Sequence, residues 1–257
     1  MKIAAISSGS NGNCYYLENR DEAILIDAGI SARQIVERMA RLGLSPAKVK
    51  GIFISHEHAD HVWGLDVLTR KYAIPAFLTR KTYESYGKPI MDSLLNFFSP
   101  GDPVQLGEIS VHPFLKCHDA AEPCSFSVSS EGKTVCVMTD IGVQCANAVA
   151  HIQNADAIFL ESNYDDRMLQ KGRYPYHLKK RIASDVGHLS NAQAARLALE
   201  HASSRLKHVF LSHLSANNNT PELALSTFHH FMKQRNDLDL EITLTSRQRE
   251  SSLVSVD

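Results

Sequence analysis

The sequence lacks several features that would assign it to a broad class at once. Its 257 residues contain no repeat, no Pro- or Gly-rich linker and no low-complexity tract. Basic and acidic residues nearly balance, at 27 and 28, so the global positive excess of a general nucleic-acid coat is absent, although a local basic surface is not excluded. The five cysteines form no CxxC pair, and their odd number is typical of free thiols in a reducing compartment.

The chain also lacks long apolar runs, and no stretch approaches the length of a transmembrane helix. The apolar segment Lys2–Ile6 is too short for the core of a signal peptide. Cys14 follows Asn13 rather than a small-residue cleavage pattern, so no lipid anchor is expected. These features predict a cytoplasmic protein without a membrane partner, and they leave the oligomeric state undefined.

Hydrophobic periodicity predicts strands early in the chain and strand–helix units later. Strands are predicted over Lys2–Ser7, Cys14–Glu18, Ala23–Asp27, Gly51–Ser55, Val104–Leu106, Ile109–Phe114, Cys124–Val128, Thr134–Met138, Ala157–Glu161, Val209–Ser212 and Leu240–Leu244. Helices are predicted from the capping box Ser31/Gln34 to Gly43, and over Val62–Tyr72, Cys145–Gln153, Asn191–His201 and Thr220–Arg235. A polar tail follows the last strand. This order predicts an α/β fold, one domain over 1–257, with two packed sheets and helices on both outer faces.

The run Ser55-His-Glu-His-Ala-Asp-His61 gathers four metal-binding side chains at a predicted strand-to-helix turn, namely His56, His58, Asp60 and His61. Imidazole nitrogens and carboxylate oxygens suit zinc and neighbouring divalent ions. Such a cluster converges on one turn only if a cation neutralises and orients it. Because a chance HxHxDH match is improbable, the run predicts metal-dependent hydrolysis. Ordinary core or surface positions are expected for His151, His201, His208, His229 and His230.

Further candidate ligands follow the ends of predicted strands. His118, Asp140 and His213 each stand where an apolar run gives way to a loop, and Asp27 ends the third strand in the same way. Loops on a rigid scaffold are the usual place for site residues. Taken singly, each is equally well explained as an ordinary loop residue. As a set they complete the ligand list of a site with two metals.

The HxHxDH run, followed by His118, Asp140 and His213 with Asp27 upstream, resembles the metallo-β-lactamase superfamily across nearly the whole chain. The resemblance implies an αββα sandwich of two mixed sheets, with the metals at one edge. It implies two divalent ions, with zinc favoured over manganese or iron.

The same resemblance implies a role for each ligand position. One metal would be held by His56, His58 and His118, and the second by Asp60, His61 and His213. Asp140 would bridge the two metals, and Asp27 would orient the ligand loop without touching a metal. Because β-lactamases of this fold typically carry Cys at the bridging position, Asp140 counts against antibiotic hydrolysis.

Glu161 and His188 narrow the class of substrate that the site is expected to take. Ser190 and Gln193 form a capping box, so His188 lies just before a predicted helix N-terminus, a good place to meet an anion. A structural role for both residues is the alternative. The pair resembles the Glu and His of tRNase Z-like phosphodiesterases, which protonate the leaving alkoxide.

A closer resemblance is to the YycJ/WalJ-like branch, whose members are regarded as 5′→3′ DNA exonucleases associated with DNA repair. It is carried by residues 7–13, 118–123, 161–163, 187–191 and 211–219. Relatives commonly have His where this chain has Tyr164, which puts the preference for strand end and ion in doubt.

A basic stretch with interleaved tyrosines lies between Glu161 and His188, and no acidic residue interrupts it from Arg167 to Arg181. A solvated face is an equally good reading of such a stretch. Beside a metal site it would hold a nucleic-acid backbone, with Tyr174 and Tyr176 stacking on bases. The loop Ser7–Asn13 can offer N–H groups to phosphate or be an ordinary turn. The candidate contacts are Ser8, Ser10, Asn11, Asn13, Arg173, Lys179, Lys180 and Asn218.

The sequence therefore predicts a dinuclear-metal phosphodiesterase, a 5′→3′ exonuclease acting on DNA rather than RNA. Asp60, Glu161 and His188 are the expected catalytic residues, with His188 held protonated by Glu161 so that it can protonate the departing sugar oxygen. One rival is a small-molecule ester, thioester or lactone hydrolase, which would need neither the basic stretch nor this pair. A second rival, a non-catalytic binding protein, would be expected to have lost metal ligands.

Overall fold

The computed structural model describes residues 1–20 and 22–257. Contacts within the chain divide it into two compact units. Unit 1 comprises Met1–Leu115, Ala120–Lys133 and Ser246–Asp257, and unit 2 comprises Lys116–Asp119 and Thr134–Thr245. The expected single domain over 1–257 stays a prediction.

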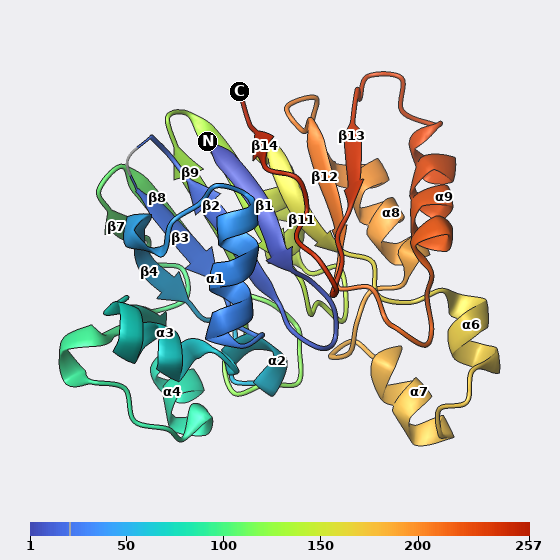
Figure 1. Cartoon of the computed structure of the whole chain (residues 1–257). Coiled ribbons are helices and arrows are strands. Elements are labelled where there is room, and N and C mark those ends of the chain that lie inside the picture. Colours follow the sequence, from blue (N-terminus) through green and yellow to red (C-terminus); the bar gives the residue numbers. More distant parts are fainter. Residues whose placement is uncertain (21) are drawn as a thin grey trace. The chain divides into compact units, whose positions relative to one another are not determined.

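Unit 1 contains a mixed sheet (Figure 1). Its strand order is β14 (Val254–Ser255), β1 (Lys2–Ser7), β2 (Cys14–Glu18), β3 (Ala23–Ile26), β4 (Val49–Phe53), β5 (Ala76–Leu78) and β6 (Leu95–Phe97). Pairing is antiparallel from β14 to β3 and parallel from β3 to β6. Parallel neighbours require crossover connections. These are α1 (Ala32–Arg41), the pair α2 (Ala59–Val62) and α3 (Leu65–Tyr72), and α4 (Arg80–Tyr86).

The helix α1 covers one face of this sheet, as Figure 1 shows. It begins after Ser31, whose hydroxyl accepts the N–H of Gln34, as the capping pattern predicted. Ile35 and Met39 lie on its buried face, in one core cluster with Ile6 and Leu25 of the strands. An apolar stripe at helical spacing thus fixes α1 on the sheet.

The two ends of the chain meet at the edge of unit 1. The segment after Leu244 was expected to be a polar tail, but it includes β14, which pairs with β1. The Met1 ammonium donates to the Val256 carbonyl at 3.1 Å, and the Val256 N–H donates to the Met1 carbonyl at 2.7 Å. Unit 1 also contains the antiparallel strands β7 (Val104–Leu106), β8 (Ile109–Leu115) and β9 (Cys124–Ser130).

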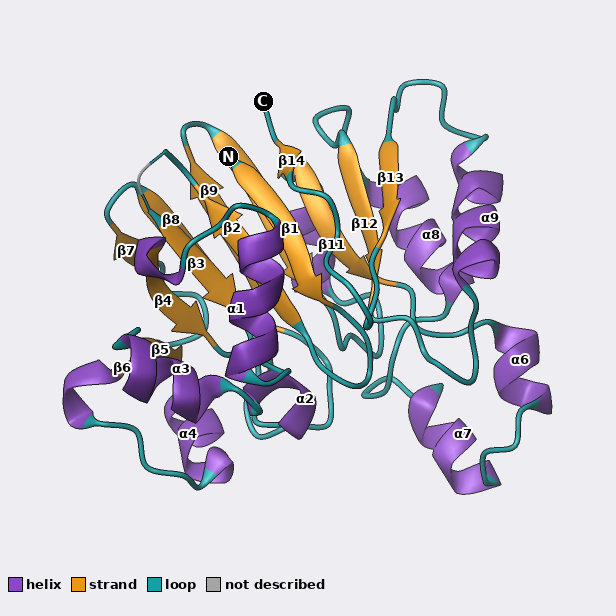
Figure 2. Cartoon of the chain, in the orientation of Figure 1, coloured by secondary structure: helices purple, strands orange, loops and turns teal. Residues whose placement is uncertain are grey.

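Unit 2 is built on parallel strands in the order β10 (Lys133–Met138), β11 (Ala157–Glu161), β12 (His208–Ser212) and β13 (Glu241–Leu244). The connecting helices are α5 (Ala146–Ile152), α6 (Asp166–Lys171), α7 (Tyr176–Ile182), α8 (Asn191–His201) and α9 (Pro221–Met232). In Figure 2, α8 and α9 lie side by side next to β12 and β13. Carboxyl ends of parallel strands share one edge, so the residues after β10, β11 and β12 are brought together there.

The predicted helix over Val62–Tyr72 was wrong in its start and its continuity. The chain forms α2 from Ala59 and then bends at Gly64 before α3. A Cβ on Gly64 would lie 2.4 Å from the Ile30 carbonyl oxygen, so only glycine fits this bend. The short elements β5, β6, α4, α6 and α7 were not predicted. Within the described part of the chain, no helix has the length and apolar character needed to cross a bilayer.

Candidate metal and proton-transfer site

Three predicted site residues share an unusual backbone conformation. Asp27 follows β3, Asp140 follows β10 and His213 follows β12, with φ angles of 62°, 57° and 56°. The left-handed region costs a residue other than glycine about 1 kcal/mol or more. Such strain clusters at functional sites because the surrounding contacts hold the residue in place. All three side chains are buried at a strand end.

In unit 1, Asp27 holds the start of the HxHxDH run. Its Oδ1 accepts the Ser55 N–H at 2.8 Å, and its Oδ2 accepts the Ser55 hydroxyl at 2.8 Å. The same Oδ2 lies 2.7 Å from Nδ1 of His61. Asp27 therefore fixes both ends of the run and leaves Nε2 of His61 as the nitrogen directed elsewhere.

The other imidazoles of the run gather around His61. The His56 ring lies 4.0 Å from the His61 ring between centroids, and His56 Nε2 lies 3.0 Å from His58 Nδ1. Asp60, in the first turn of α2, places its Oδ2 3.4 Å from His61 Nε2. The fully buried Asn13 lies between them, with its Nδ2 3.3 Å from Asp60 Oδ2 and 3.2 Å from His61 Nε2. Nitrogen and oxygen atoms of His56, His58, Asp60 and His61 thus lie close together in unit 1, and their role as metal ligands stays a prediction.

In unit 2, Glu161 ties two imidazoles together. Its Oε1 lies 2.8 Å from His188 Nδ1 and 2.9 Å from His213 Nδ1. Its Oε2 accepts the backbone N–H groups of Ile141 at 2.7 Å and Leu189 at 3.3 Å. The Glu161 carboxylate is fully buried and holds both rings by one nitrogen, so Glu161 acts through His188 and His213 as a positioning residue.

Electrostatics keep Glu161 ionised. Burial alone would raise the pKa of Glu161, but the charges and hydrogen bonds of His188 and His213 outweigh it and lower that pKa. The His188 side chain is 19% exposed and has the ionised Glu161 as its partner. The His188 ring is therefore held by one nitrogen and partly open to solvent.

His118 is also held by one nitrogen. Its Nδ1 lies 3.1 Å from the Gly187 carbonyl, and its Nε2 lies 4.0 Å from Asp140 Oδ1. Burial lowers the pKa of His118 to about 4, because desolvation outweighs the attraction of Asp140. The neutral ring, which is the form that binds metals, is therefore the form present at neutral pH.

The donor set fits a divalent metal ion. In His61, His118 and His213, Nδ1 faces a carboxylate or a carbonyl, an arrangement typical of histidines that bind a metal through Nε2. In unit 2, ligand atoms of Asp140, Glu161, His188 and His213 lie within 4.8 Å of one another. Imidazole and carboxylate donors suit zinc, manganese or iron.

The predicted nucleic-acid contacts are divided between surface and interior. Ser10, Asn11, Arg173 and Lys180 are exposed, whereas Ser8, Asn13 and Asn218 are buried. The Ser8 hydroxyl is 2.8 Å from the Tyr15 hydroxyl, which itself donates to Asn13. Lys179 donates to the Gln170 carbonyl at 2.8 Å, and Arg181 is paired with Asp119 at 2.6 Å. Only part of the basic stretch therefore faces solvent without an acidic partner.

Sequence reasoning missed several residues that hold the site. Ser55, the first residue of the Ser55–His61 run, contacts Asp27, His56 and His61. Asn163 donates to the His213 carbonyl at 2.9 Å and so supports its left-handed backbone. The position of Ser55 beside the run was a usable signal, whereas Asn163 lies far from His213 in the chain and gave none.

Comparisons with known proteins agree with this geometry. The family model described as the metallo-beta-lactamase superfamily matches residues 8–213. The exodeoxyribonuclease WalJ of Streptococcus pneumoniae is 32% identical over 264 residues, which cover 100% of this chain and 98% of that protein. The exodeoxyribonuclease YycJ of Bacillus anthracis is 35% identical over 243 residues, 91% of this chain and 90% of that protein.

Solved structures show the same fold. The metallo-beta-lactamase fold protein YhfI from Bacillus subtilis has a TM-score of 0.74 at 18% identity, covering 97% of this chain and 98% of that one. The short form of human tRNase Z has a TM-score of 0.68 at 17% identity and full coverage of both chains, 100% each. These likenesses confirm the predicted fold class. The match over residues 8–213 and the full-length relatives together place this chain in the metallo-β-lactamase superfamily.

Proposed function

We propose that the protein is a metal-dependent phosphodiesterase that acts as a 5′→3′ exonuclease on DNA. The observation that carries the proposal is the Glu161–His188 pair, placed within 4.8 Å of the ligand atoms of Asp140 and His213. An oriented imidazole beside metal ligands is suited to an alkoxide leaving group, which needs a proton. The two full-length relatives named exodeoxyribonucleases support DNA as the polymer.

The proposed cofactor is a pair of divalent ions, with zinc favoured and manganese or iron as alternatives. One ion would bind His56, His58 and His118, and the other Asp60, His61 and His213, with Asp140 shared. When bound, such ions supply Lewis acidity and lower the pKa of coordinated water to about 7. Asp27 would hold His61 and Ser55 in place during this chemistry.

The chain's own part in the reaction is proton transfer and positioning. Glu161 fixes the His188 ring through Nδ1, so the opposite nitrogen, Nε2, delivers the proton. The departing sugar oxygen takes that proton as the phosphorus–oxygen bond breaks. His188 lies just before α8, whose N-terminus has the complete Ser190/Gln193 capping box that was predicted.

Binding of the polymer is assigned to the exposed part of the basic stretch. A cavity of about 400 Å³ on unit 2 is lined by Tyr164, Tyr176, Lys179 and Lys180, among others. The Tyr176 ring is 81% exposed and available for stacking. Burial raises the pKa of Tyr164 to about 12, so its phenol stays protonated and neutral. Arg173 and Lys180 are the cations that we propose to contact phosphates.

The decisive experiment is digestion of end-labelled single- and double-stranded DNA and RNA with zinc, manganese or iron added. We expect loss of mononucleotides from the 5′ end of DNA. His188→Ala should keep its metal content and lose about 100-fold or more in turnover on DNA. It should lose much less on an ester with a good leaving group, and the surface variant His229→Ala should behave as wild type.

Equal losses on both substrates would remove the proton-donor role of His188. Activity on short esters without any nucleic-acid cleavage would favour the small-molecule hydrolase instead. A cytoplasmic location and a part in DNA repair stay predictions.

A further inference from the structure

Trp63 is the one tryptophan of the chain, and it is 67% exposed. It follows the last residue of α2, three positions after Asp60. Its backbone N–H donates to the Ala59 carbonyl at 3.0 Å. An indole is among the most costly side chains to leave in water, and exposed aromatic rings are enriched where a protein binds a partner or ligand. An exposed indole therefore follows the Ser55–His61 run by two positions, and the proposed chemistry does not use it.

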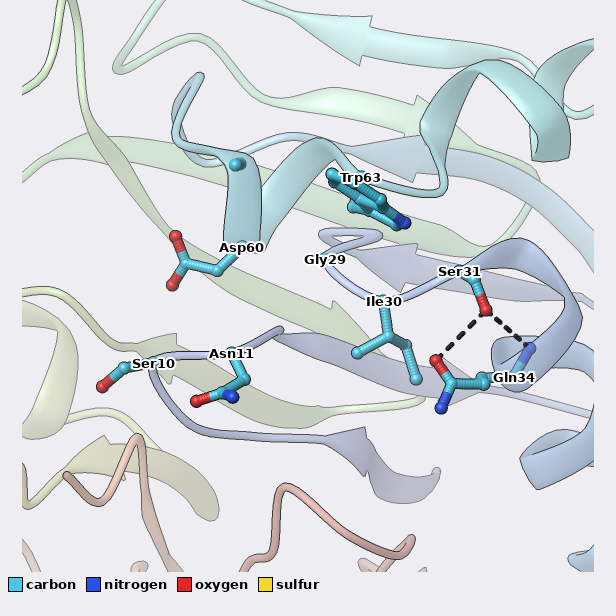
Figure 3. Close-up of a pocket in the computed structure, with 9 residues that line it drawn as sticks. Ser10, Asn11, Gly29, Ile30, Ser31, Gln34, Asp60 and Trp63 are labelled. Carbon is cyan, nitrogen blue, oxygen red and sulfur yellow. Dashed lines mark hydrogen bonds between the residues drawn. The ribbon is translucent and has the colours of Figure 1, made fainter. Parts of the chain in front are cut away.

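Trp63 borders a cavity of about 370 Å³ within unit 1. Figure 3 shows that its lining comes from three segments: Asp60 of α2 with Trp63 just after it, Ser10 and Asn11 from the loop after β1, and Ser31 and Gln34 from the start of α1. Ile30 lies between them. Asp60 is the only ionisable side chain among the described residues that line this cavity. The guanidinium of Arg247 stands behind the lining and donates to Asn11 Oδ1 at 3.2 Å. A phosphate in the cavity would meet the Asp60 carboxylate, whereas a neutral ring would meet an indole, Ile30 and two amides.

Backbone hydrogen bonds fix the position of Trp63 relative to Asp60. The Asn13 N–H donates to the Asp60 carbonyl, the Ala28 N–H to the His61 carbonyl and the Gly64 N–H to the Ala28 carbonyl, each at 2.8 Å. A Cβ on Gly29 would lie 1.6 Å from the Asp60 carbonyl oxygen, so the backbone at Gly29 lies against α2 with no room for a side chain. Trp63 is thus attached to a segment that backbone hydrogen bonds hold on both sides.

We propose that Trp63 stacks on a nucleobase of the bound DNA strand and that this cavity is a base subsite next to Asp60. The amide oxygens of Asn11 and Gln34 already accept from Arg247 at 3.2 Å and from Ser31 at 3.1 Å, so their NH2 groups are the donors directed to the edge of a base. Stacking of this kind tolerates sequence because every base has a π-face. The inference rests on the proposed exonuclease function and adds the position of one base to it.

Kinetics test the subsite with matched variants and matched strands. Trp63→Ala should raise KM for 5′-phosphorylated single-stranded DNA on the order of 5- to 100-fold with little change in kcat, because one stacked base is lost. The KM of Trp63→Phe should fall between those of wild type and Trp63→Ala. Val67→Ala, on the neighbouring helix and outside this cavity, should match wild type. On a strand whose 5′-terminal nucleotides carry no base, wild type and Trp63→Ala should become equal.

Fluorescence gives an independent readout because no second tryptophan contributes. Titration of the chelator-treated protein with the same oligonucleotide should quench Trp63, and the abasic strand should not. Wild-type KM in Trp63→Ala, or cleavage of DNA without quenching, would overturn the subsite while leaving the exonuclease intact. Quenching by DNA that the enzyme does not cleave with any metal would retain base binding and reject the exonuclease. Absence of both quenching and cleavage would reject both proposals.

Discussion

Glu161 uses one carboxylate oxygen to hold both His188 and His213, so a single atom serves a proposed proton donor and a proposed metal ligand. A change at Glu161 must therefore disturb two functions, whereas a change at His188 should disturb one. The ion pair is fully buried on the carboxylate side, so the effect should not be screened by solvent.

We expect Glu161→Gln to lower metal affinity about 10- to 100-fold, since the partner of a ligating histidine contributes that much. Turnover on DNA should fall as well, even with metal in excess, because a neutral amide holds the His188 ring less firmly than the carboxylate does. Metal content and kinetics of Glu161→Gln and His188→Ala, measured side by side, separate the two effects. Glu241→Gln is the matched control, because Glu241 faces His208 at 3.3 Å but is 65% exposed. Full metal affinity in Glu161→Gln would contradict the shared role.

His118 should make the metal-free protein less stable in acid. Its pKa falls from 6.5 to about 4 on folding, so the unfolded chain takes up a proton that the folded chain does not. Stability from this group is fully present above pH 6.5 and is lost as the pH falls towards 4. The slope is at most about 1.4 kcal/mol per pH unit. Urea unfolding of the chelated protein between these pH values should show this loss relative to His118→Asn. Parallel curves for the two proteins would contradict it.

Residues of the site were predictable where they are contiguous or share a family pattern. His56, His58, Asp60 and His61 form one motif, so their convergence needed only a local turn. Asn13 was predicted as a phosphate contact, but it lies buried against Asp60 and His61, 47 and 48 positions away in the chain. No local pattern reports such a contact, because it exists only after β1 and β2 have paired with the rest of the sheet.

At the scale of elements, strand ends do most of the positioning. The left-handed residues after β3, β10 and β12 turn the chain sharply, and each turn aims one site residue. Regular strands and the longer helices α1 and α8 were predictable, because each shows a full hydrophobic period or a cap. The three-residue strands β5 and β6 and the short helices α4, α6 and α7 were not, because so few residues do not complete a pattern.

The end of α3 carries a left-handed residue with no role in the site. Ala73, the C-cap, has φ 52° and ψ 35°. Glycine adopts this conformation without the clash of a Cβ, so Ala73→Gly should raise the free energy of unfolding by about 0.5–1 kcal/mol. Ala40→Gly, at an exposed position inside α1, should lower it by about the same amount. Urea unfolding of both variants checks that the free energy of unfolding changes in opposite directions. A lower free energy of unfolding in both variants would show that Ala73 is not strained.

At the scale of the whole molecule, the family fold followed from seven residues that match the superfamily pattern in order. The division into two compact units did not follow from the sequence. Residues 116–119 and 246–257 each belong to a unit other than that of their chain neighbours. Such exchanges are set by long-range hydrogen bonds, such as those from Asp119 to Val186 and from Ser8 to Ser246, which leave no local signal.

The pairing of β14 with β1 has a consequence for engineering. Because Met1 and Val256 exchange two backbone hydrogen bonds, a short linker could join Asp257 to Met1, and the chain could be cut elsewhere. The exposed turn at Glu131–Gly132 is a suitable opening. A circular permutant opened there should keep the circular dichroism spectrum and cooperative melting of the parent, whereas one opened inside β11 should not fold. Failure of the first permutant would mean that synthesis order, and not only final topology, shapes this molecule.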